Sequence, residues 1–340
     1  MKRLLLFAAI LGSVVSGSAI TLGQVDDFED GTLQNWRGGA SPVNVATGGP
    51  RGIDDNYIRL TSTPTTNLGM ANDVQWTGNW IAAGVTVVEA HLRNEGENPL
   101  EIRLVFTLGQ SNRFTSTRAF MLPADGKWYK ASFPVRASDL VRTAGTMTYT
   151  EMLSDVPTLL FRHDSGDPSH LPDPIEGVLG LDNIEASNKA DLQPEVLTKI
   201  RGNETGTLQN LFFSDNIRMQ WRPGIVFSPS QPPAEFDLDF FAPFVNPTAM
   251  SFNIEGFASS AGLHRQISLM NQSNIYVVVV PYTSSSTSET LVTVPVINFA
   301  NYINPVTGLI RARISYRIGG PVFGFPWIGQ QDKIFVRLMP

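Results

Sequence analysis

Leu100-Glu-Ile-Arg-Leu-Val-Phe-Thr-Leu108 is the stretch that decides the fold class of this 340-residue chain. Every second residue is apolar, and these residues share one face: Leu100, Ile102, Leu104, Phe106 and Leu108. Glu101, Arg103 and Thr107 fall on the opposite face. Because side chains of a β-strand alternate with a period of two, this pattern predicts a strand with one face against a core.

Other segments show the same pattern. In residues 127–135 one face holds Tyr129, Ala131, Phe133 and Val135, and the other holds Trp128, Lys130 and Ser132. Residues 235–240 and 311–318 also alternate. Residues 275–280 form a continuous, largely β-branched apolar run, which is typical of a central strand covered on both faces.

Two of these segments carry opposite charges on one face. Glu235, Asp237 and Asp239 line the first, and Arg311, Arg313 and Arg317 line the second. Opposite charges on neighbouring strands stabilise their pairing. We therefore predict that the two strands lie in one sheet, with their charged faces on the same solvent side. The alternative is two separately solvated faces.

Turn-forming residues are abundant, with 29 Gly and 23 Pro, and no helical period of useful length is present. One short helical turn is expected near residues 149–153. Parallel sheets need crossover helices, so the strands should be antiparallel. We therefore predict an all-β chain with two antiparallel β-sandwich domains.

The domain boundaries follow from the composition. We place the first domain at residues 25–186 and the second at 203–340. Between them, residues 187–202 are polar and include Pro194. This segment is predicted to be a linker, although 195–200 would also suit one helical turn. Each domain is long enough to bury its own core.

The first residues have the three parts of a signal peptide. Lys2 and Arg3 are followed by an apolar stretch at 4–11 and by the small residues Gly17-Ser18-Ala19. Cleavage is expected after Ala19, or as late as residue 23, giving a secreted, extracellular or cell-surface protein. The alternative is a buried strand or an uncleaved anchor. No later segment reaches the length of a membrane helix, so we expect no transmembrane segment in the mature chain.

Charge and cysteine content narrow the function further. The chain has no cysteine and a net charge of −6. Residues 25–190 carry 21 acidic and 13 basic side chains, whereas residues 191–340 carry ten of each. An acidic first domain argues against a nucleic-acid partner and is compatible with calcium.

Sequence motifs of common enzymes are missing. The chain has no G-x-S-x-G, H-E-x-x-H, Walker A or G-x-G-x-x-G motif. His163 and His170 share a loop with Asp164, Asp167 and Asp173, but the spacing matches no known metal site, so a solvated loop is expected. We therefore predict that the protein is not an enzyme.

Three short segments of the first domain resemble the jelly-roll modules of the galactose-binding-like and carbohydrate-binding kind. They are Asp27-Phe28-Glu29-Asp30-Gly31-Thr32-Leu33-Gln34-Asn35-Trp36, Asp125-Gly126-Lys127-Trp128 and Gly180-Leu181-Asp182-Asn183-Ile184. The resemblance implies a jelly roll whose first and last strands lie side by side. It also implies a structural calcium held by Glu29 and Asp182, with Asp27 as a weaker candidate. The alternative is that these acids are turn and cap residues.

The same resemblance implies a glycan site with an exposed aromatic ring and polar side chains around it. Trp128 and Lys130 lie off the core face of their strand, and Glu89 and His91 share the polar face of another. Trp76 and Trp80 are the other candidates for the sugar platform. For each tryptophan the alternative is packing beneath a loop, since Trp is usually largely buried. Trp36 is expected in the core.

The second domain resembles an uncharacterised β module found at the end of secreted bacterial proteins. The matching segments are Met219-Gln-Trp-Arg-Pro-Gly-Ile-Val226, Leu309-Ile-Arg-Ala-Arg-Ile-Ser-Tyr316 and Gly320-Pro-Val-Phe-Gly-Phe-Pro-Trp327. The preferred hypothesis is a secreted, non-catalytic protein that binds a carbohydrate weakly through its first domain. The alternatives are a structural or adhesive cell-surface component and an accessory subunit of a polysaccharide-degrading system.

Overall fold

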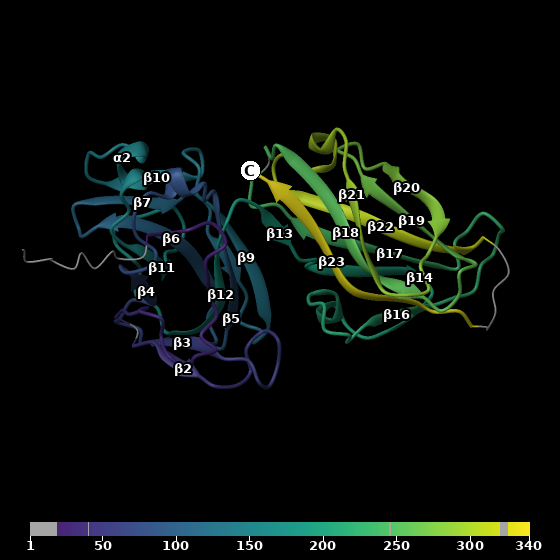
Figure 1. The fold of residues 1–340 in the computed structure, drawn as a ribbon, viewed down its shortest axis with the longest axis horizontal. Coiled ribbons are helices and arrows are strands. Elements are labelled where there is room, and N and C mark those ends of the chain that lie inside the picture. The colour runs from purple at the N-terminus through teal and green to yellow at the C-terminus, as the bar shows by residue number, and fades with distance from the viewer. Residues whose placement is uncertain (1–18, 40, 245, 320–325) are drawn as a thin grey trace, which may run out of the picture.

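A computed structural model describes residues 19–39, 41–244, 246–319 and 326–340. In these residues the chain forms two β-sandwiches, each made of two antiparallel sheets. Figure 1 shows the two sandwiches next to each other, with β9 (Trp128–Pro134) of the first facing β13 (Ala190–Leu192) of the second. The predicted fold class is confirmed.

The first sandwich consists of sheets A and B. In spatial order, sheet A contains β2 (Val43–Val45), β3 (Tyr57–Ser62), β12 (Gly177–Ser187), β5 (Val87–Asn94) and β9, and β1 (Val25–Asp26) also pairs with β12. Sheet B contains β10 (Leu140–Ala144), β7 (Asn112–Ser116), β6 (Leu100–Leu108), β11 (Leu159–His163) and β4 (Gly69–Asn72), and β8 (Phe120–Leu122) also pairs with β6. Strands distant in sequence are neighbours in space, which makes this sandwich jelly-roll-like. The predicted pairing of its first and last strands is confirmed.

Alternation explains which side chains fill the first core. Leu100, Ile102, Leu104 and Phe106 are fully buried, whereas Leu108 at the strand end is 46% exposed. The core tryptophans bring polar N–H groups that need acceptors. The buried Asp26 carboxylate accepts the indole N–H of Trp36 at 2.7 Å and that of Trp76 at 2.6 Å. Trp36 is therefore a core residue, as predicted.

Two short helices complete the first domain: α1 (Trp80–Ala83) and α2 (Tyr149–Ser154). The second agrees with the helical turn expected near residues 149–153. Thr148 caps the start of this helix: its hydroxyl accepts the backbone N–H of Glu151, and the Glu151 carboxylate accepts the backbone N–H of Thr148. This reciprocal capping satisfies two N–H groups that a helix start leaves open.

The second sandwich consists of sheets C and D. Sheet C contains β15 (Asn203–Thr205), β16 (Met219–Arg222), β23 (Gly329–Met339), β18 (Ala249–Ala258) and β21 (Thr290–Pro295), and β13 also pairs with β23. Sheet D contains β14 (Val196–Arg201), β17 (Ala234–Phe241), β22 (Leu309–Ile318), β19 (Leu263–Met270) and β20 (Tyr276–Ser284). The 3-10 helices η1 (Leu208–Leu211) and η2 (Phe299–Tyr302) lie in its connections.

The predicted linker at residues 187–202 is wrong. Strand β12 continues to Ser187, and β13 and β14 already belong to the second sandwich. Residues 195–200 therefore contribute a strand and no helical turn. Strand β14 exposes much of its length, which explains its polar composition, whereas Ala190 and Leu192 of β13 are buried in the second core.

The charged strands of the second sandwich are neighbours, as predicted. In the register of β17 and β22, Asp237 lies opposite Arg313 and Asp239 opposite Arg311. Both pairs are bonded through two nitrogens of the guanidinium, with shortest distances of 2.7 and 2.5 Å. Arg317 does not form such a pair, and its guanidinium donates to the Ser230 carbonyl instead.

The apolar run at 275–280 is not central. It belongs mainly to β20, which is the last strand of sheet D and pairs only with β19 among the described residues. Val278 is 48% exposed. The prediction of a strand covered on both faces is therefore wrong.

The predicted signal peptide at 1–19 lies almost entirely outside the described residues. The chain from Ala19 onward packs on the first domain, where Ile20 is 4% exposed and belongs to the core. Its backbone N–H donates to the Thr77 carbonyl at 2.8 Å. Within the described ranges, no helix has the length and hydrophobicity needed to span a bilayer.

Candidate functional site

The polar face of sheet A, predicted to bind a glycan, is covered by the second domain. Glu89 is 1% exposed, and its carboxylate accepts the Lys130 ammonium at 2.8 Å and the Ser132 hydroxyl at 3.2 Å. The same carboxylate accepts the backbone N–H of Asp191, a β13 residue, at 2.7 Å. Glu89 and Lys130 therefore hold the domain boundary and do not face solvent as a sugar site requires.

His91 is also part of this boundary. Its ring lies 5.4 Å from that of Phe213, measured between ring centroids. Within the described part of the chain, neither ring nitrogen has a hydrogen-bond partner, although both are inaccessible to solvent. Burial lowers the pKa of His91 to about 3, and the positive charge of Lys130 adds to the effect. The side chain is neutral at physiological pH and packs as an apolar group.

Trp128 is half-buried and packs beneath the loop that contains Gly48. Its indole N–H donates to the Gly48 carbonyl at 3.0 Å. Tyr57 meets the ring edge-on at 5.2 Å, and the Arg93 guanidinium lies 5.9 Å from the ring centre. These neighbours occupy the surfaces that a sugar would need, so the expected open platform is absent at this residue.

Trp76 and Trp80 are fully buried in the first core. The Trp80 indole N–H donates to the Trp76 carbonyl at 3.3 Å, and the two rings are 6.0 Å apart. Their expected role as exposed sugar platforms is wrong. Trp80 is the first residue of α1, and Trp76 lies four residues before it in the same core.

The acidic residues predicted to hold calcium are only partly brought together. Burial is the main cause that raises the pKa of Asp182 to about 8, and the charges of Asp55 and Glu29 add to it. Asp27 lies elsewhere, accepting the Glu29 backbone N–H and the Gln34 amide. Carboxylate oxygens are the ligands that calcium prefers, and a cation would remove the repulsion among Glu29, Asp55 and Asp182, so these three residues fit a cation chemically. The sequence analysis missed Asp55, which no motif marks.

These carboxylates are not a ready-made metal site. Over the described ranges, no three acidic or histidine side chains are gathered closely enough to hold a metal ion. The Glu29 carboxylate accepts the backbone N–H of Asn56 at 3.0 Å. Binding calcium would therefore require Glu29, Asp55 and Asp182 to draw together.

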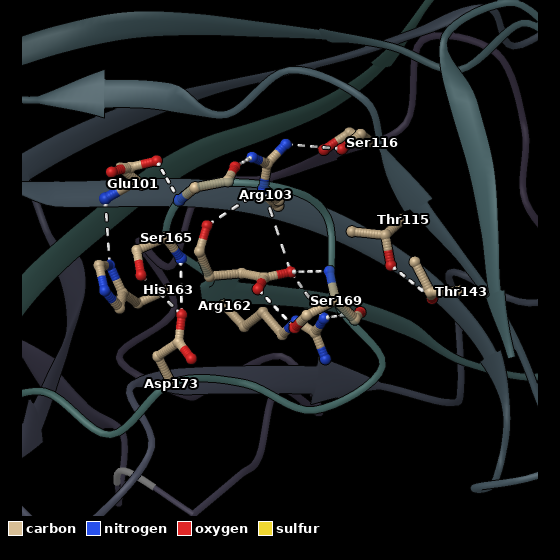
Figure 2. Close-up of polar contacts among 12 residues, drawn as sticks. Glu101, Arg103, Thr115, Ser116, Thr143, Arg162, His163, Ser165, Ser169 and Asp173 are labelled. Carbon is tan, nitrogen blue, oxygen red and sulfur yellow. Dashed lines mark hydrogen bonds and ion pairs between the residues drawn. The ribbon is translucent and has the colours of Figure 1, made fainter.

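The loop at 164–173 covers the outer face of sheet B (Figure 2). Asp167 and Leu171 are exposed, in agreement with the expected solvated loop, whereas Asp164 is buried. Arg103 and Arg162 lie opposite each other on β6 and β11. Asp164 is fully buried and accepts the Arg162 guanidinium at 2.7 Å. The remaining guanidinium N–H groups bond mostly to backbone carbonyls of the loop and of β7. His163 accepts the Glu101 backbone N–H at 3.1 Å. This cluster anchors the loop.

A cleft of about 730 Å³ lies between the two domains. The first domain contributes β8, its flanking residues and one side of β9, and the second contributes residues 192–196, Phe212 and the end of β17. The volume is in the range of small-ligand sites. Its walls are built from both chain halves, so the cleft exists only because the domains are docked.

The cleft combines apolar surface with a few polar groups. Phe120 and Tyr129 line one side, and Phe241, which is 39% exposed, lines the other. Polar lining residues include Arg118, Lys130, Gln193 and Glu195. The Tyr129 hydroxyl donates to Asp125 at 2.8 Å, and burial and Asp125 raise the Tyr129 pKa, so it stays a neutral donor. Of the predicted ligand residues, only Lys130 reaches this cleft.

Sequence reasoning missed the cleft for a physical reason. Tyr129 falls on the core side of its strand by alternation, and Phe241 is the last residue of β17, just beyond the alternating segment 235–240. The alternation of side chains along a strand therefore does not predict that either residue is exposed. Their juxtaposition depends on how the sandwiches dock, which strand patterns do not encode.

Comparison with known proteins gives distant structural similarity alone. The sequence matches no protein-family model and no curated protein. The chain is similar to the N-terminal CBM22-1–CBM22-2 tandem domain of Xyn10C from Paenibacillus barcinonensis, at 13% identity over 94% of this chain and 98% of that chain, with a TM-score of 0.31. It is also similar to a family 11 carbohydrate-binding module from Clostridium thermocellum, at 16% identity over 49% of this chain and 96% of that chain, with a TM-score of 0.34. An exo-beta-agarase matches at 14% identity over 48% of this chain and 25% of that chain, with a TM-score of 0.34.

Proposed function

We propose that this chain is a secreted, non-catalytic protein that binds a carbohydrate in the cleft between its two sandwiches. The observation that supports this proposal is the cleft of about 730 Å³ with aromatic walls and a small number of polar groups. Such a combination is typical of ligand sites. The site differs from the one expected on sheet A, because the second domain covers that face.

The chemistry of the cleft suits a sugar. Aromatic rings offer flat, rigid, apolar surfaces against which the C–H face of a sugar ring packs with little loss of entropy. Phe120, Tyr129 and Phe241 supply these surfaces. Arg118, Gln193 and Glu195 are placed to bond hydroxyl groups. An open cleft of this kind should give dissociation constants of about 1 μM to 1 mM.

The number of carboxylates in the cleft favours sugar binding over sugar hydrolysis. A glycosidase needs two carboxylates on either side of the scissile bond. Glu195 is the one carboxylate among the cleft-lining residues that the structure describes. The proposal therefore assigns no reaction to the protein.

Calcium and export are further parts of the proposal. Calcium would be held by Glu29, Asp55 and Asp182, where it would offset the burial and then the charge repulsion that raise the pKa of Asp182. Export is supported by the order of Lys2, Arg3, the apolar stretch and Ala19. A structural role at the cell surface is the second candidate, and the uncovered edge strands of the second domain favour it.

The test is a glycan panel on the chain from Ile20 onward, with and without calcium, followed by calorimetry on any ligand found. Phe241→Ala removes an aromatic wall and should weaken binding about tenfold. Phe227→Ala is the matched control, because Phe227 is 88% exposed and lies outside the cleft. A protein that ignores the whole panel, or one in which both variants bind like the original, would refute the proposed site.

A further inference from the structure

One side of the second sandwich is left open by its two end strands. Strand β20 ends sheet D and β21 ends sheet C, and each is hydrogen-bonded along one edge only within the described residues. Both strands line a hollow of about 170 Å³ between the sheets. The two free edges therefore lie on the same side of the sandwich, the one labelled β20 and β21 in Figure 1.

These edges expose apolar side chains on both strands. Val278 of β20 is 48% exposed, and Leu291 and Val292 of β21 are 54% and 37% exposed. Soluble proteins usually protect a free edge with charges, because an unprotected edge pairs with another strand. Here the sequence from Gln266 to Ile310 contains a single charged residue, Glu289. Its carboxylate is already bonded to Arg218 at 2.7 Å.

We propose that the β20 edge pairs with β20 of a second copy of this chain, forming a two-fold dimer. This inference goes beyond the proposed function and does not depend on it. In a two-fold antiparallel pairing the same residues meet from both copies. A charged edge would repel its own copy, whereas this edge carries no charge to repel.

The sequence of β20 suits pairing with itself. Tyr276-Val-Val-Val-Val280 is nearly symmetric, so antiparallel pairing about its centre places Val278 beside Val278, Val277 beside Val279, and Tyr276 beside Val280. Pro281 then limits the pairing, because proline has no N–H to donate. A partner of different chemistry would be expected to meet a charged or polar pattern, and Val277 to Val280 offer none.

The experiment measures association by sedimentation velocity between about 1 and 100 μM. The original chain should form a dimer. Val278→Lys should raise the dimer dissociation constant about a hundredfold or more, because two lysines meet near the axis. Val306→Lys is the matched control: Val306 is 83% exposed and lies outside both end strands, so the dimer should persist.

A mixing experiment separates self-pairing from loss of folding. Val278→Lys and Val278→Glu should each be monomeric, and an equal mixture should form a heterodimer through opposite charges. A monomeric original chain, an unaffected Val278→Lys dimer, open-ended polymers, or a mixture that stays monomeric would overturn the proposal. Glycan binding in the cleft should be the same in all these variants, so failure here is distinguishable from failure of the proposed function.

Discussion

Replacing His91 by leucine removes two ring nitrogens that lie buried at the domain boundary with no hydrogen-bond partner in the described residues. An unsatisfied buried polar group costs about 1–3 kcal/mol. Leucine is similar in volume to histidine and keeps the apolar contact with Phe213. We therefore expect His91→Leu to raise the free energy of unfolding at pH 7 by about 1–3 kcal/mol.

The same substitution should remove a sensitivity to acid. Burial lowers the pKa of His91 to about 3, whereas the reference value is 6.5. As the pH falls below 6.5, His91 therefore takes up a proton in the unfolded chain but stays neutral in the folded chain. The stability that depends on neutral His91 is fully present above pH 6.5 and is lost as the pH falls towards 3. At pH 5 the loss is about 2 kcal/mol, since one pKa unit corresponds to about 1.4 kcal/mol.

Urea denaturation at pH 7 and pH 5 measures both effects, with each variant compared with the original chain at the same pH. This comparison matters because Asp182 has the opposite pH dependence. Its pKa is raised to about 8 in the folded chain, so its contribution to the free energy of unfolding falls as the pH rises from 4 to 8. His91→Gln is the matched control, since it keeps polar atoms at the boundary but does not titrate. It should show no gain at pH 7 yet lose the acid sensitivity. A His91→Leu chain that is less stable at pH 7 and equally acid-sensitive would refute the reasoning.

Two further predictions concern the first domain. Chelating calcium should lower the melting temperature of the original chain, because a bound ion stabilises the folded state by mass action, by about 2.7 kcal/mol at a hundred times its dissociation constant. Asp182→Asn should abolish this response, and calorimetric curves that ignore the chelator would remove calcium from the proposal. The exported protein should begin at Ile20, since cleavage near residue 23 would delete a residue that packs in the core. Intact-mass measurement decides between the two positions, and a chain that still begins at Met1 would exclude cleavage.

The strands of both domains were predictable because their alternation is a local property of the sequence. Leu100, Leu104 and Phe106 are buried as their spacing requires, and the pairing of Asp237 with Arg313 follows from opposite charges on two alternating strands. What alternation does not reveal is whether the second face of a strand meets water or protein. Glu89 and Lys130 look solvent-facing in sequence yet lie beneath the second domain.

The errors in the second domain have a related cause. A continuous valine run predicts burial only if both faces of the strand are covered, and β20 is instead an end strand. The polar segment at 187–202 was predicted to be a linker because its two strands are short and β14 is largely exposed. In both cases the position of the strand within its sheet decides its environment. That position depends on contacts between distant parts of the chain.

The charges that made the face of sheet A look like a sugar site also account for the cleft. Lys130 binds Glu89, Glu89 accepts the backbone N–H of Asp191, and Asp191 forms a two-point ion pair with Arg337 at 2.6 and 2.7 Å. Glu89 is 1% exposed, so removing its partner Lys130 would leave an uncompensated buried charge, which is strongly destabilising. A rotation of one sandwich against the other would break the hydrogen bond between Glu89 and Asp191, so these contacts favour a single docked arrangement. Only in that arrangement do Tyr129 and Phe241 line one cleft.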